Sequence, residues 1–553
     1  MKKKKMKIIP LGGLGEIGKN MMVFEYNGRL LVIDAGLMFP KDELLGIDLI
    51  LPDFSFLRER ADQVEAVLLT HGHEDHVGAL PFLLREINVP VYGTRLTLGL
   101  VANKLEEHGL AARAKLREIK AGKPQDIGPF HCDFISVAHS IPDGVGVAVT
   151  TPVGTVIHSG DFKLDPNPID KRRTDMGKFG ELGSKGVLLL LSDSTNAEYE
   201  GVTGPEKSVG KTLDDIFTQA PGRIIAASFA SHIHRIQQVV DTARRHRRKL
   251  TIVGRSMVRN SQIARELGYL KIPDDMLIRL NEVNNFRPSK VVILSSGSQG
   301  EPLSALSRMA AGNHKKVKLE PGDTVIISAR PVPGNEVSVH RVINRLFKAG
   351  VTVKYESVAH VHVSGHAARE ELKMLINMAQ PEYFMPIHGE YRHLHFHAEL
   401  AREMGMSPKH IITASNGDVI ELSGGRVRIA DRIDVGMTFV DGLEVGDIQD
   451  VTLRDREKLS RDGTFIVVAP IRQQDGSVVS RPDITAKGFV YMGNRRKLMK
   501  EVLNLVETIL EESAGRGASD PEQLQEHIHN RLAKFLFKKT KKRPLILALV
   551  VEV

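Results

Sequence analysis

Four side chains that can bind a metal ion lie close together in the segment His71-Gly-His-Glu-Asp-His76. Imidazole and carboxylate groups are ligands for zinc and other divalent transition ions. His71 and His73 are two positions apart and can bind one ion, whereas Asp75 and His76 are adjacent and can bind a second. A polar loop that caps a helix is the alternative, but this pattern arises rarely by chance in a chain of 553 residues. The spacing therefore predicts a metal site.

Local sequence patterns predict the elements that hold such side chains in place. Ala66–Leu69 is a short apolar run typical of a buried strand, and Val77–Leu84 has the pattern of a helix. Similar strands are expected shortly before other polar residues: Arg29–Ile33 before Asp34, Phe134–Ala138 before His139, Thr155–His158 before Asp161, and Val187–Leu191 before Asp193. Taken alone, an Asp or His at the end of a strand is often structural.

Composition indicates a large globular protein from a reducing compartment. The chain has 553 residues, one cysteine (Cys132) and a net charge of +9. A single cysteine cannot form an internal disulfide, and the basic N-terminus is not followed by the apolar core of a signal peptide. The longest apolar run, near Leu545–Val551, is too short to span a bilayer. We therefore expect a soluble cytoplasmic protein with no membrane partner. The positive charge favours a polyanionic partner, although a solvated basic surface explains it equally well.

The glycine-rich segment Gly12–Asn20 (GGLGEIGKN) is not expected to bind a dinucleotide. Its glycines do not follow the GxGxxG spacing between a strand and a helix, and Met21–Tyr26 has the pattern of another strand. A turn is the simpler interpretation.

Residues 204–353 alternate between strand and helix patterns, which favours a mostly parallel sheet covered by helices. Loops at the carboxyl ends of such strands form binding crevices. Three of these loops contain small hydroxylated residues, glycines or arginine, which suit phosphate contacts: Ser228–His232, Ser295–Gly300 and Ala329–Asn335. Taken separately, each loop is more simply explained as a turn before a helix.

The motifs, taken in order, resemble the metallo-β-lactamase superfamily, whose signature is HxHxDH. This superfamily also has an Asp before the signature, a later lone His, a bridging Asp and a closing His, which match Asp34, His139, Asp161 and His388. Six separated segments further resemble the β-CASP branch and, within it, the bacterial ribonuclease J family: GGLGEIGKN, SGDFKLDPNP, SDSTNAE, SSGSQGE, HVSGHA and MPIHGEYRH. The resemblance runs from near residue 7 to at least residue 450 and is specific, because both order and content agree.

The resemblance implies an α/β protein with two metal ions. The implied fold is a metallo-β-lactamase αββα sandwich with an inserted β-CASP α/β domain and a small C-terminal α+β domain. One ion would be bound by His71, His73, His139 and Asp161, and the other by Asp75, His76, Asp161 and His388. Two ions about 3.5–4 Å apart need such a shared anionic ligand. The ions would be zinc, with manganese as the alternative, because no thiolate ligand selects between them.

The remaining site residues take their roles from the same resemblance. Asp34 would orient groups of the ligand loop without binding metal. Asp75 and His76 would be catalytic through the metal ion that they bind. His366 would protonate the leaving 3′ oxygen, and Asp193 would orient the site. His362 and Ser364 would hold the scissile phosphate, and ordinary loop polarity explains these two equally well. In the insert, Ser296, Ser298 and Arg330 are predicted to bind a terminal 5′ phosphate.

Sequence patterns divide the chain into five segments: 1–203 and 354–430 for the metallo-β-lactamase domain, 204–353 for the β-CASP domain, 431–460 for an irregular linker, and 461–553 for the α+β domain. The last segment is expected to contain strands at 464–469 and 486–491, an apolar helical stripe from Leu498 to Ile509, and a helix opening at Ser519-Asp520-Pro521. The basic run Lys538–Arg543 precedes a final strand from Leu545. In similar proteins this domain supports oligomerisation, so we expect a homodimer or homotetramer.

The predicted function is a two-metal ribonuclease. It would act as a 5′→3′ exonuclease that prefers 5′-monophosphate ends and as an endonuclease, in RNA maturation and mRNA decay. RNA is the expected partner, together with proteins of an RNA-degradation complex. The alternative is a non-catalytic RNA-binding scaffold of the same fold, and the intact metal motifs argue against it. A third possibility, a hydrolase of small esters or thioesters, is disfavoured by the large insert.

Overall fold

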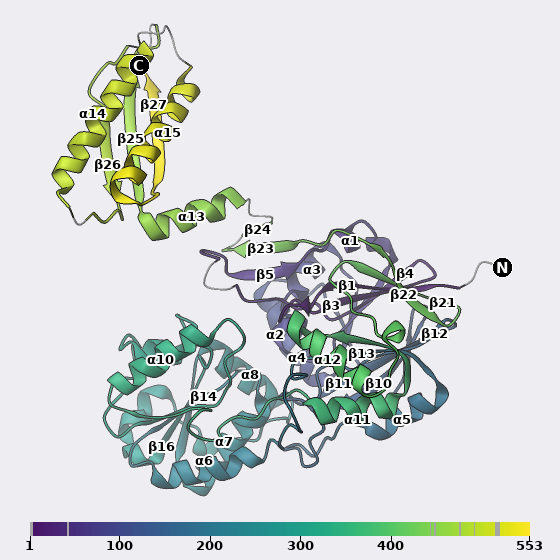
Figure 1. Ribbon diagram of the computed structural model, residues 1–553. Helices are drawn as coiled ribbons and strands as arrows, with labels where there is room; N and C mark the ends of the chain where they lie inside the picture. Colours follow the sequence, from purple (N-terminus) through teal and green to yellow (C-terminus); the bar gives the residue numbers. More distant parts are fainter. Residues whose placement is uncertain are drawn as a thin grey trace. The chain divides into compact units, whose positions relative to one another are not determined.

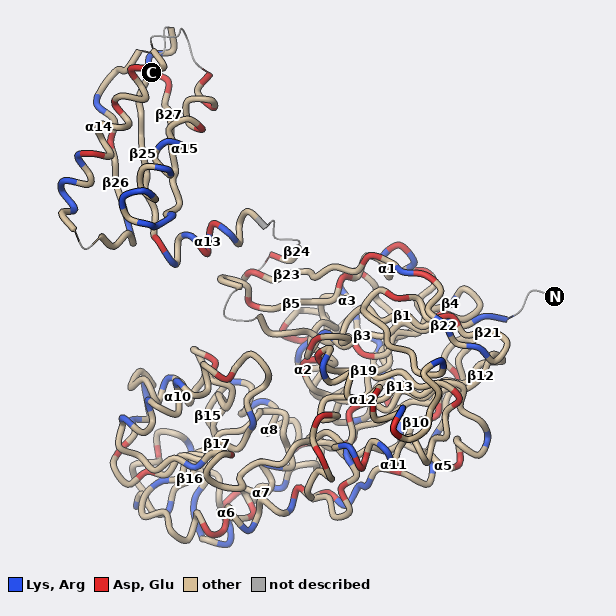
Figure 2. Tube along the Cα trace, viewed as in Figure 1, with Lys and Arg blue, Asp and Glu red and all other residues tan. Residues whose placement is uncertain are grey.

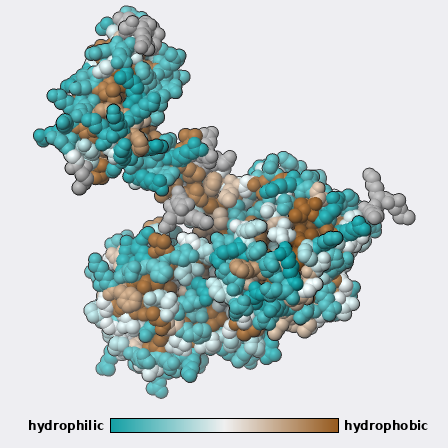
Figure 3. Space-filling model, in the orientation of Figure 1, coloured by the Kyte–Doolittle hydropathy of each residue, from teal (hydrophilic) through white to brown (hydrophobic). Residues whose placement is uncertain are grey.

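The computed structural model describes residues 4–40, 44–442, 444–446, 450–474, 477–491, 493–514 and 520–553. The chain forms two compact units (Figure 1). One consists of Met1–Phe39 with Leu49–Thr438, and the other of Pro40–Asp48 with Phe439–Val553. Ser519, at the expected start of the last helix, lies outside the described residues. Most of the face shown in Figure 3 is hydrophilic. Among the described helices, none has both the length and the apolar character needed to cross a membrane.

The first unit contains two large mixed sheets. One has the order β22-β21-β1-β3-β4-β6-β7-β8, and its strands are β1 (Met6–Gly12), β3 (Met21–Tyr26), β4 (Arg29–Ile33), β6 (Val64–Leu68), β7 (Pro90–Gly93), β8 (Lys115–Glu118), β21 (Asp418–Ser423) and β22 (Arg426–Arg432). The other has the order β19-β13-β12-β11-β10-β9, and its strands are β9 (Gln125–Ile127), β10 (Phe130–Val137), β11 (Gly144–Thr151), β12 (Gly154–His158), β13 (Val187–Asp193) and β19 (Pro381–Ile387). Three short strands are β2 (Leu14–Gly15), β5 (Leu49–Pro52) and β20 (Gly389–Glu390).

The two sheets pack face to face around a common apolar core. Phe24 and Leu31 of one sheet pack with Phe134, Val147 and Leu189 of the other, and all five side chains are almost fully buried. Helices cover the outer faces, with α5 and α11 against the six-stranded sheet. The helices of these layers are α1 (Ser55–Arg58), α2 (Glu74–Val77), α3 (Leu80–Glu86), α4 (Arg95–Glu107), α5 (Met176–Lys185), α11 (Arg369–Ala379) and α12 (Tyr391–Glu403). This arrangement is the αββα sandwich that the motifs predicted.

The insert forms a five-stranded sheet in which every pair of neighbouring strands is parallel. In spatial order its strands are β15 (Lys249–Val253), β16 (Val291–Ser295), β14 (Ile224–Ala227), β17 (Thr324–Ile327) and β18 (Thr352–Lys354). Helices cover both faces, which explains why the strands are continuously apolar. One face carries α6 (Ser208–Gln219), α7 (Ile233–Arg245) and α8 (Arg255–Glu266), and the other α9 (Ala305–Ala310) and α10 (Glu336–Lys348). Short 3₁₀ helices are at Ala61–Gln63, Asp274–Met276, Leu280–Asn285, Pro288–Lys290 and Pro408–His410.

The second unit is an α+β domain built on the sheet β26-β25-β27. Its strands are β25 (Thr464–Ile471), β26 (Asp483–Lys487) and β27 (Leu545–Glu552), and its two long helices are α14 (Arg495–Ala514) and α15 (Pro521–Thr540). Val467 of the sheet and Val502, Ile528 and Leu532 of the helices form its fully buried core. The apolar stripe predicted from Leu498 to Ile509 therefore faces this sheet. The sequence also predicts a buried face of Ile528, Leu532, Phe535 and Leu536 on the last helix, and of these only Phe535 is half-buried.

Three expectations from the sequence are corrected. Residues 431–460 are not irregular, because they contain β23 (Met437–Asp441), β24 (Glu444–Gly446) and most of α13 (Asp450–Asp462). The strand expected at 486–491 ends at Lys487, because Gly488 adopts a left-handed backbone with φ 68°. The single helix expected over Val77–Leu84 is replaced by two short helices, α2 (Glu74–Val77), which contains Asp75 and His76, and α3 (Leu80–Glu86).

Candidate active site

The ends of six strands position the polar side chains that the sequence singled out. Strands β10, β12, β13 and β19 run in the same direction, since β10 and β12 are both antiparallel to β11 and the others pair in parallel. Their carboxyl ends therefore meet at one edge of the sheet. In the facing sheet, β4 and β6 are also parallel. The residues at or just after these six strand ends are Asp34, His71, His139, Asp161, Asp193 and His388.

Four ligand atoms form a first buried group. His73 Nδ1 lies 3.0 Å from His71 Nε2 and 3.2 Å from His139 Nε2. Asp161 Oδ2 lies 3.6 Å from His71 Nε2 and 3.8 Å from His139 Nε2. Atoms on a tetrahedron around an ion with bonds of 2.0–2.1 Å would be about 3.3 Å apart. These separations therefore fit a single metal ion.

A second group uses the same carboxylate oxygen. Asp161 Oδ2 lies 3.2 Å from His76 Nε2 and 3.1 Å from His388 Nε2. Asp75 Oδ2 lies 3.5 Å from His76 Nε2 and 3.8 Å from His388 Nε2. All seven predicted ligands are thus brought together in two groups of four, with Asp161 common to both. The donor set, nitrogen and oxygen without sulfur, fits zinc or manganese.

Hydrogen bonds to the opposite ring nitrogens orient the ligand histidines. His139 Nδ1 lies 2.7 Å from the carbonyl oxygen of Gly365, so Nδ1 donates and Nε2 is left for the metal. Asp34 Oδ2 lies 2.7 Å from His76 Nδ1, and this carboxylate also accepts from the backbone and hydroxyl of Thr70, both at 2.8 Å. Asp34 thus orients a ligand and its loop without joining either ligand group, which is the arrangement that the resemblance implies.

The electrostatics of the site suit a cation. Burial lowers the pKa of His73 to about 4 and the pKa of His71 and His139 well below 6.5, so these imidazoles are neutral and can donate lone pairs. Burial alone would raise the pKa of Asp161, but neighbouring histidines, led by His388, outweigh it and hold that pKa well below 3.8. Burial would also lower the pKa of His388, yet Asp161 outweighs it and raises this pKa to about 9. The carboxylates therefore attract positive charge to this position.

His366 lies beside both ligand groups. Its ring centroid is 4.8 Å from that of His139 and 5.6 Å from that of His388. His366 Nδ1 lies 2.7 Å from Oδ2 of the buried Asp193, which leaves Nε2 for a substrate. Burial would lower the pKa of His366, but the charge and hydrogen bond of Asp193 outweigh it and raise that pKa. Asp193 therefore fixes the orientation of the imidazole.

Several polar residues at this site were missed by the sequence reasoning. Asn196 Nδ2 donates to Ser364 Oγ at 2.8 Å and to the carbonyl oxygen of His366 at 2.9 Å, and Thr203 Oγ1 donates to that same carbonyl at 2.7 Å. Asn20 Nδ2 donates to the carbonyl oxygen of Asp75 at 3.0 Å. Asn196 and Asn20 belong to the SDSTNAE and GGLGEIGKN segments, so the motifs contained a signal. Their partners, however, are far away in the chain.

Gln299 joins two of the insert loops predicted to bind phosphate. Its Nε2 donates to the carbonyl oxygen of Arg330 at 2.9 Å, and its Oε1 accepts from the backbone of Val332 at 2.7 Å. Ser298 is only 3% exposed, whereas Ser296 is half-buried. The Arg330 guanidinium is already paired with Glu356, with Nε 3.0 Å from Oε1, and lies 4.9 Å from the Tyr199 ring centroid. Arg330 therefore does not offer an unpaired charge.

His362 lies in a different environment from the metal ligands. Burial lowers its pKa well below 6.5, and Arg235, Arg330 and Lys163 lower it further. Its Nδ1 has no hydrogen-bond partner among the described residues. Nearby, the fully buried Arg235 donates to Glu206 Oε1 at 2.7 Å and to the carbonyl oxygen of Val361 at 2.5 Å. His362 thus belongs to a buried polar cluster of the insert, and Ser364 is engaged by Asn196.

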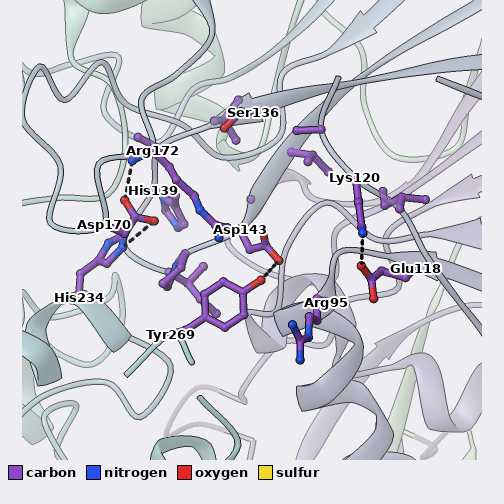
Figure 4. Close-up of a pocket in the computed structure, with 18 residues that line it drawn as sticks. Arg95, Glu118, Lys120, Ser136, His139, Asp143, Asp170, Arg172, His234 and Tyr269 are labelled. Carbon is purple, nitrogen blue, oxygen red and sulfur yellow. Dashed lines mark hydrogen bonds and ion pairs between the residues drawn. The ribbon is translucent and has the colours of Figure 1, made fainter. Parts of the chain in front are cut away.

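A cavity of about 320 Å³ adjoins His139 on the side of the insert (Figure 4). Tyr269 of the insert donates to Asp143 Oδ2 at 2.6 Å, and Arg172 donates to Oδ1 of the same carboxylate at 2.5 Å. His234, also of the insert, lies 3.4 Å from Asp170 Oδ2. These contacts tie the insert to the sandwich next to the metal ligands, so the two domains share the walls of the site.

Family models match the chain in succession. The matching models describe the metallo-beta-lactamase superfamily (residues 14–203), the ribonuclease J beta-CASP domain (221–346), a Zn-dependent metallo-hydrolase RNA specificity domain (350–414) and the ribonuclease J C-terminal domain (451–553). Together with the packed sheets and the two ligand groups, these matches define a metal-dependent hydrolase of the metallo-β-lactamase superfamily with a β-CASP insert.

Full-length relatives narrow the class further. The chain is 42% identical over 556 residues to ribonuclease J2 of Bacillus subtilis, with all of both chains covered. It is 44% identical over 554 residues to ribonuclease J of Thermus thermophilus, covering 99% of this chain and 95% of that one. It is 43% identical over 547 residues to ribonuclease J of Corynebacterium glutamicum, covering 99% and 76%. The chain belongs to the ribonuclease J family.

A comparison with solved structures shows similarity in the fold only. One matching structure is a protein of unknown function from Enterococcus faecalis, with a TM-score of 0.53 and 15% identity over 76% of this chain and all of that one.

Proposed function

We propose that this protein hydrolyses RNA phosphodiester bonds with two divalent ions, both 5′→3′ exonucleolytically and by internal cleavage, in RNA maturation and mRNA decay. The observation that carries the proposal is the pair of four-atom ligand groups joined at Asp161 Oδ2. Membership of the ribonuclease J family supports RNA as the substrate.

Each ligand group would bind one of the two ions. His71, His73 and His139 would bind one, Asp75, His76 and His388 the other, and Asp161 both. When bound, such a pair of ions activates a water as nucleophile and offsets negative charge on the attacked phosphate. We propose zinc as the natural pair and manganese as the alternative.

His366 is proposed as the general acid that protonates the leaving 3′ oxygen. Asp193 holds Nδ1 at 2.7 Å, and Asn196 and Thr203 both donate to the His366 carbonyl, so the ring is fixed from two sides. A group held in this way can deliver a proton along a constant direction. Asp193 is then a positioning residue rather than a metal ligand.

Recognition of the 5′ end is proposed for the loops 295–300 and 329–335. Gln299 ties these loops together, because it donates to the carbonyl oxygen of Arg330 and accepts from the backbone amide of Val332. Ser296 remains a candidate contact. Buried Ser298 and the Glu356-paired Arg330 are better suited to shaping the loops than to direct charge contact. These loops should accommodate a monophosphate more readily than a triphosphate, which adds bulk and charge.

Several finer properties are proposed with this function. The domain limits are 1–203 with 354–430, 204–353, 431–460 and 461–553. A homodimer or homotetramer is proposed, supported by an exposed apolar sheet face of the C-terminal unit. A cytoplasmic location agrees with Cys132, a buried free thiol whose pKa burial raises to about 12. Proteins of an RNA-degradation complex remain proposed partners.

One experiment tests the central proposal and its alternative, a scaffold without turnover. Purified protein is stripped with a chelator and given end-labelled RNA carrying either a 5′-monophosphate or a 5′-triphosphate. We expect no cleavage without metal, cleavage after zinc or manganese is added, and faster trimming of the monophosphate. Asp75→Ala removes one ligand and should stay inactive with metal. Absence of cleavage by the metal-loaded wild type would instead favour the scaffold.

A further inference from the structure

One end of the C-terminal unit gathers basic side chains from three elements. Lys487 ends β26, Arg495–Lys500 begin α14, and Lys538–Arg543 end α15 and lead into β27. Lys539 Nζ lies 2.9 Å from Glu501 Oε2, which shows that the start of α14 and the end of α15 are adjacent. Figure 2 shows these cations at the same end of the domain. We call this cluster the basic pole; its members are Lys487, Arg495, Arg496, Lys497, Lys500, Lys538, Lys539, Lys541, Lys542 and Arg543.

The cations of the basic pole are largely free of carboxylate partners. Among the described residues, Lys539 alone in this cluster forms an ion pair, with Glu501. Arg495 Nη2 donates to the carbonyl oxygen of Ala486 at 3.3 Å, which leaves its charge uncompensated. Except for the half-buried Lys542, the side chains are exposed. The pole therefore presents accumulated positive charge to solvent.

The placement of charge on α14 opposes the dipole of that helix. Cations are favourable at a helix C-terminus and unfavourable at an N-terminus. The first turn of α14 has no acidic residue and contains Arg495, Arg496 and Lys497, whereas Glu511 and Glu512 lie near its end. On α15 the lysines lie at the favourable end. Helix stability thus explains the lysines of α15 but not the cations of α14, and an external anion accounts for both.

Aromatic rings lie among these cations. Phe537 is 38% exposed, and its ring centroid is 4.7 Å from Arg543 Cζ and 5.4 Å from Lys541 Nζ. Lys542 Nζ lies 5.5 Å from the centroid of Phe489. Phe489 is half-buried, so Phe537 is the exposed ring of the pole. An exposed ring beside unpaired cations is the combination that contacts single-stranded nucleic acid through stacking and phosphate charge. The proposed ribonuclease function favours RNA as the anion over an acidic protein or an anionic membrane.

We infer that the basic pole is a second RNA-binding surface, which holds single-stranded RNA by its phosphates outside the catalytic site. This inference rests on the proposed ribonuclease function and deepens it. Because the pole contributes binding and no chemistry, its loss weakens the association with long RNA and leaves the hydrolysis of a small phosphodiester unchanged.

The test compares two triple variants of the full chain. One variant combines Lys497→Glu, Lys500→Glu and Lys541→Glu, which reverse three charges. The matched control replaces the same three lysines by Arg and keeps all three positive charges. Binding of an unstructured RNA is measured with a chelator present, as a function of salt. The affinity K for RNA falls as salt rises, and three lost phosphate contacts should make the slope of log K against log salt shallower by about 2. The salt dependences of the wild type and the Glu variant should meet near 1 M salt, so binding by the variant should be roughly 100-fold weaker near 0.1 M salt. The Arg control should match the wild type.

The other measurements separate this inference from the proposed function. With metal, hydrolysis of bis(p-nitrophenyl) phosphate should be equal in all three proteins, and circular dichroism should show that the variants are folded. If the wild type hydrolyses RNA and the Glu variant binds RNA with an unchanged salt slope, the inference is overturned while the function stands. A loss of binding in the Arg control overturns it as well. Tighter binding of the pole to phosphatidylglycerol vesicles or to polyglutamate than to RNA overturns it in favour of a membrane or an acidic protein.

Discussion

The rings of His366 and His388 lie close together, with centroids 5.6 Å apart, but the two histidines have different contacts. His388 Nε2 is within 3.1 Å of the shared carboxylate oxygen of Asp161, whereas His366 Nδ1 contacts Asp193, which lies outside the two ligand groups of four. Asp193, His366 and His388 nevertheless lie close enough to Asp161 to form a possible third group of ligands. Substitutions can distinguish a ligand from a proton donor.

His366→Ala should retain both metal ions and slow single-turnover cleavage by roughly 10²–10⁴-fold, the usual contribution of a general acid. His388→Ala should lose one ion, because it removes a ligand of the second group. Metal content per chain, measured beside the single-turnover rate, checks both expectations. Loss of metal in the His366 variant, with retention in the His388 variant, would mean that the two roles are reversed.

At the same scale, the sequence predicted the ligand atoms better than the residues that support them. His71 to His76 were nominated by their local spacing, whereas His139, Asp161 and His388 were nominated by the resemblance to the metallo-β-lactamase superfamily. Asn196 and Gln299 were not nominated, because what makes them important is a hydrogen bond to a partner distant in sequence, such as Ser364, 168 positions away. A single sequence contains no record of such pairings.

At the scale of elements, the loop that contains Gly365 fixes His139 by direct backbone contact. A Cβ atom at residue 365 would lie 2.6 Å from His139 Cε1 and 2.7 Å from Nδ1, whose hydrogen bond to the Gly365 carbonyl sets the ring direction. Neither the loop nor the ring can accommodate such a methyl group without moving.

Gly365→Ala should therefore displace a metal ligand while the remainder of the fold stays intact. A shift of about 1 Å in a catalytic group costs on the order of 10²-fold in rate. The measurements are cleavage rate and zinc affinity, with circular dichroism to verify the fold. Gly446→Ala is the control, since a Cβ there meets nothing within 4 Å. Equal cleavage rates in the two variants would show that the loop moves to accommodate the methyl group without displacing His139.

A second element-scale feature is the buried pair of Arg235, on α7, and Glu206, just before α6. Arg235 is 0% exposed and Glu206 is 3% exposed. Removing one partner of such a pair leaves the other charge buried without compensation. Arg235→Met should therefore lower the free energy of unfolding by about 3–5 kcal/mol, as measured by urea denaturation of chelator-treated protein. The double variant with Glu206→Gln should recover part of this loss. A loss below about 1 kcal/mol for Arg235→Met would show that Lys163, 3.9 Å from Glu206, is sufficient to compensate it.

Elements with apolar periodicity were predictable, and elements without it were not. The parallel strands of the insert were found because both faces are buried and the runs are continuously apolar. Helix α13 was taken as part of an irregular linker, since it is polar all round and none of the side chains described for it is buried. Such a helix has no hydrophobic stripe that a sequence pattern can reveal.

At the scale of the whole molecule, the C-terminal sheet has one face that its own helices do not cover. Helices α14 and α15 cover the face that contains Val467 and Ile546. The opposite face carries an apolar stripe, because register pairs Ile466 with Leu547, Val468 with Leu549, and Pro470 with Val551. Leu547, Leu549 and Val551 are 44%, 49% and 45% exposed. Their strand, β27, is also at the edge of the sheet, where further pairing is available.

A contiguous apolar stripe of this kind on a folded domain marks an association surface. We expect the wild-type protein to be a homodimer or homotetramer and Leu547→Ser with Leu549→Ser to shift it toward the monomer, as measured by light scattering during size-exclusion chromatography. Ile429→Ser, which changes a 44% exposed apolar residue on β22, is the matched control and should leave the mass unchanged. Hydrolysis of a small phosphodiester should persist in both variants, because every proposed metal ligand belongs to the other unit. An unchanged mass in the double variant would place the subunit interface elsewhere, and loss of hydrolysis with the monomer would show that association is required to assemble the active site.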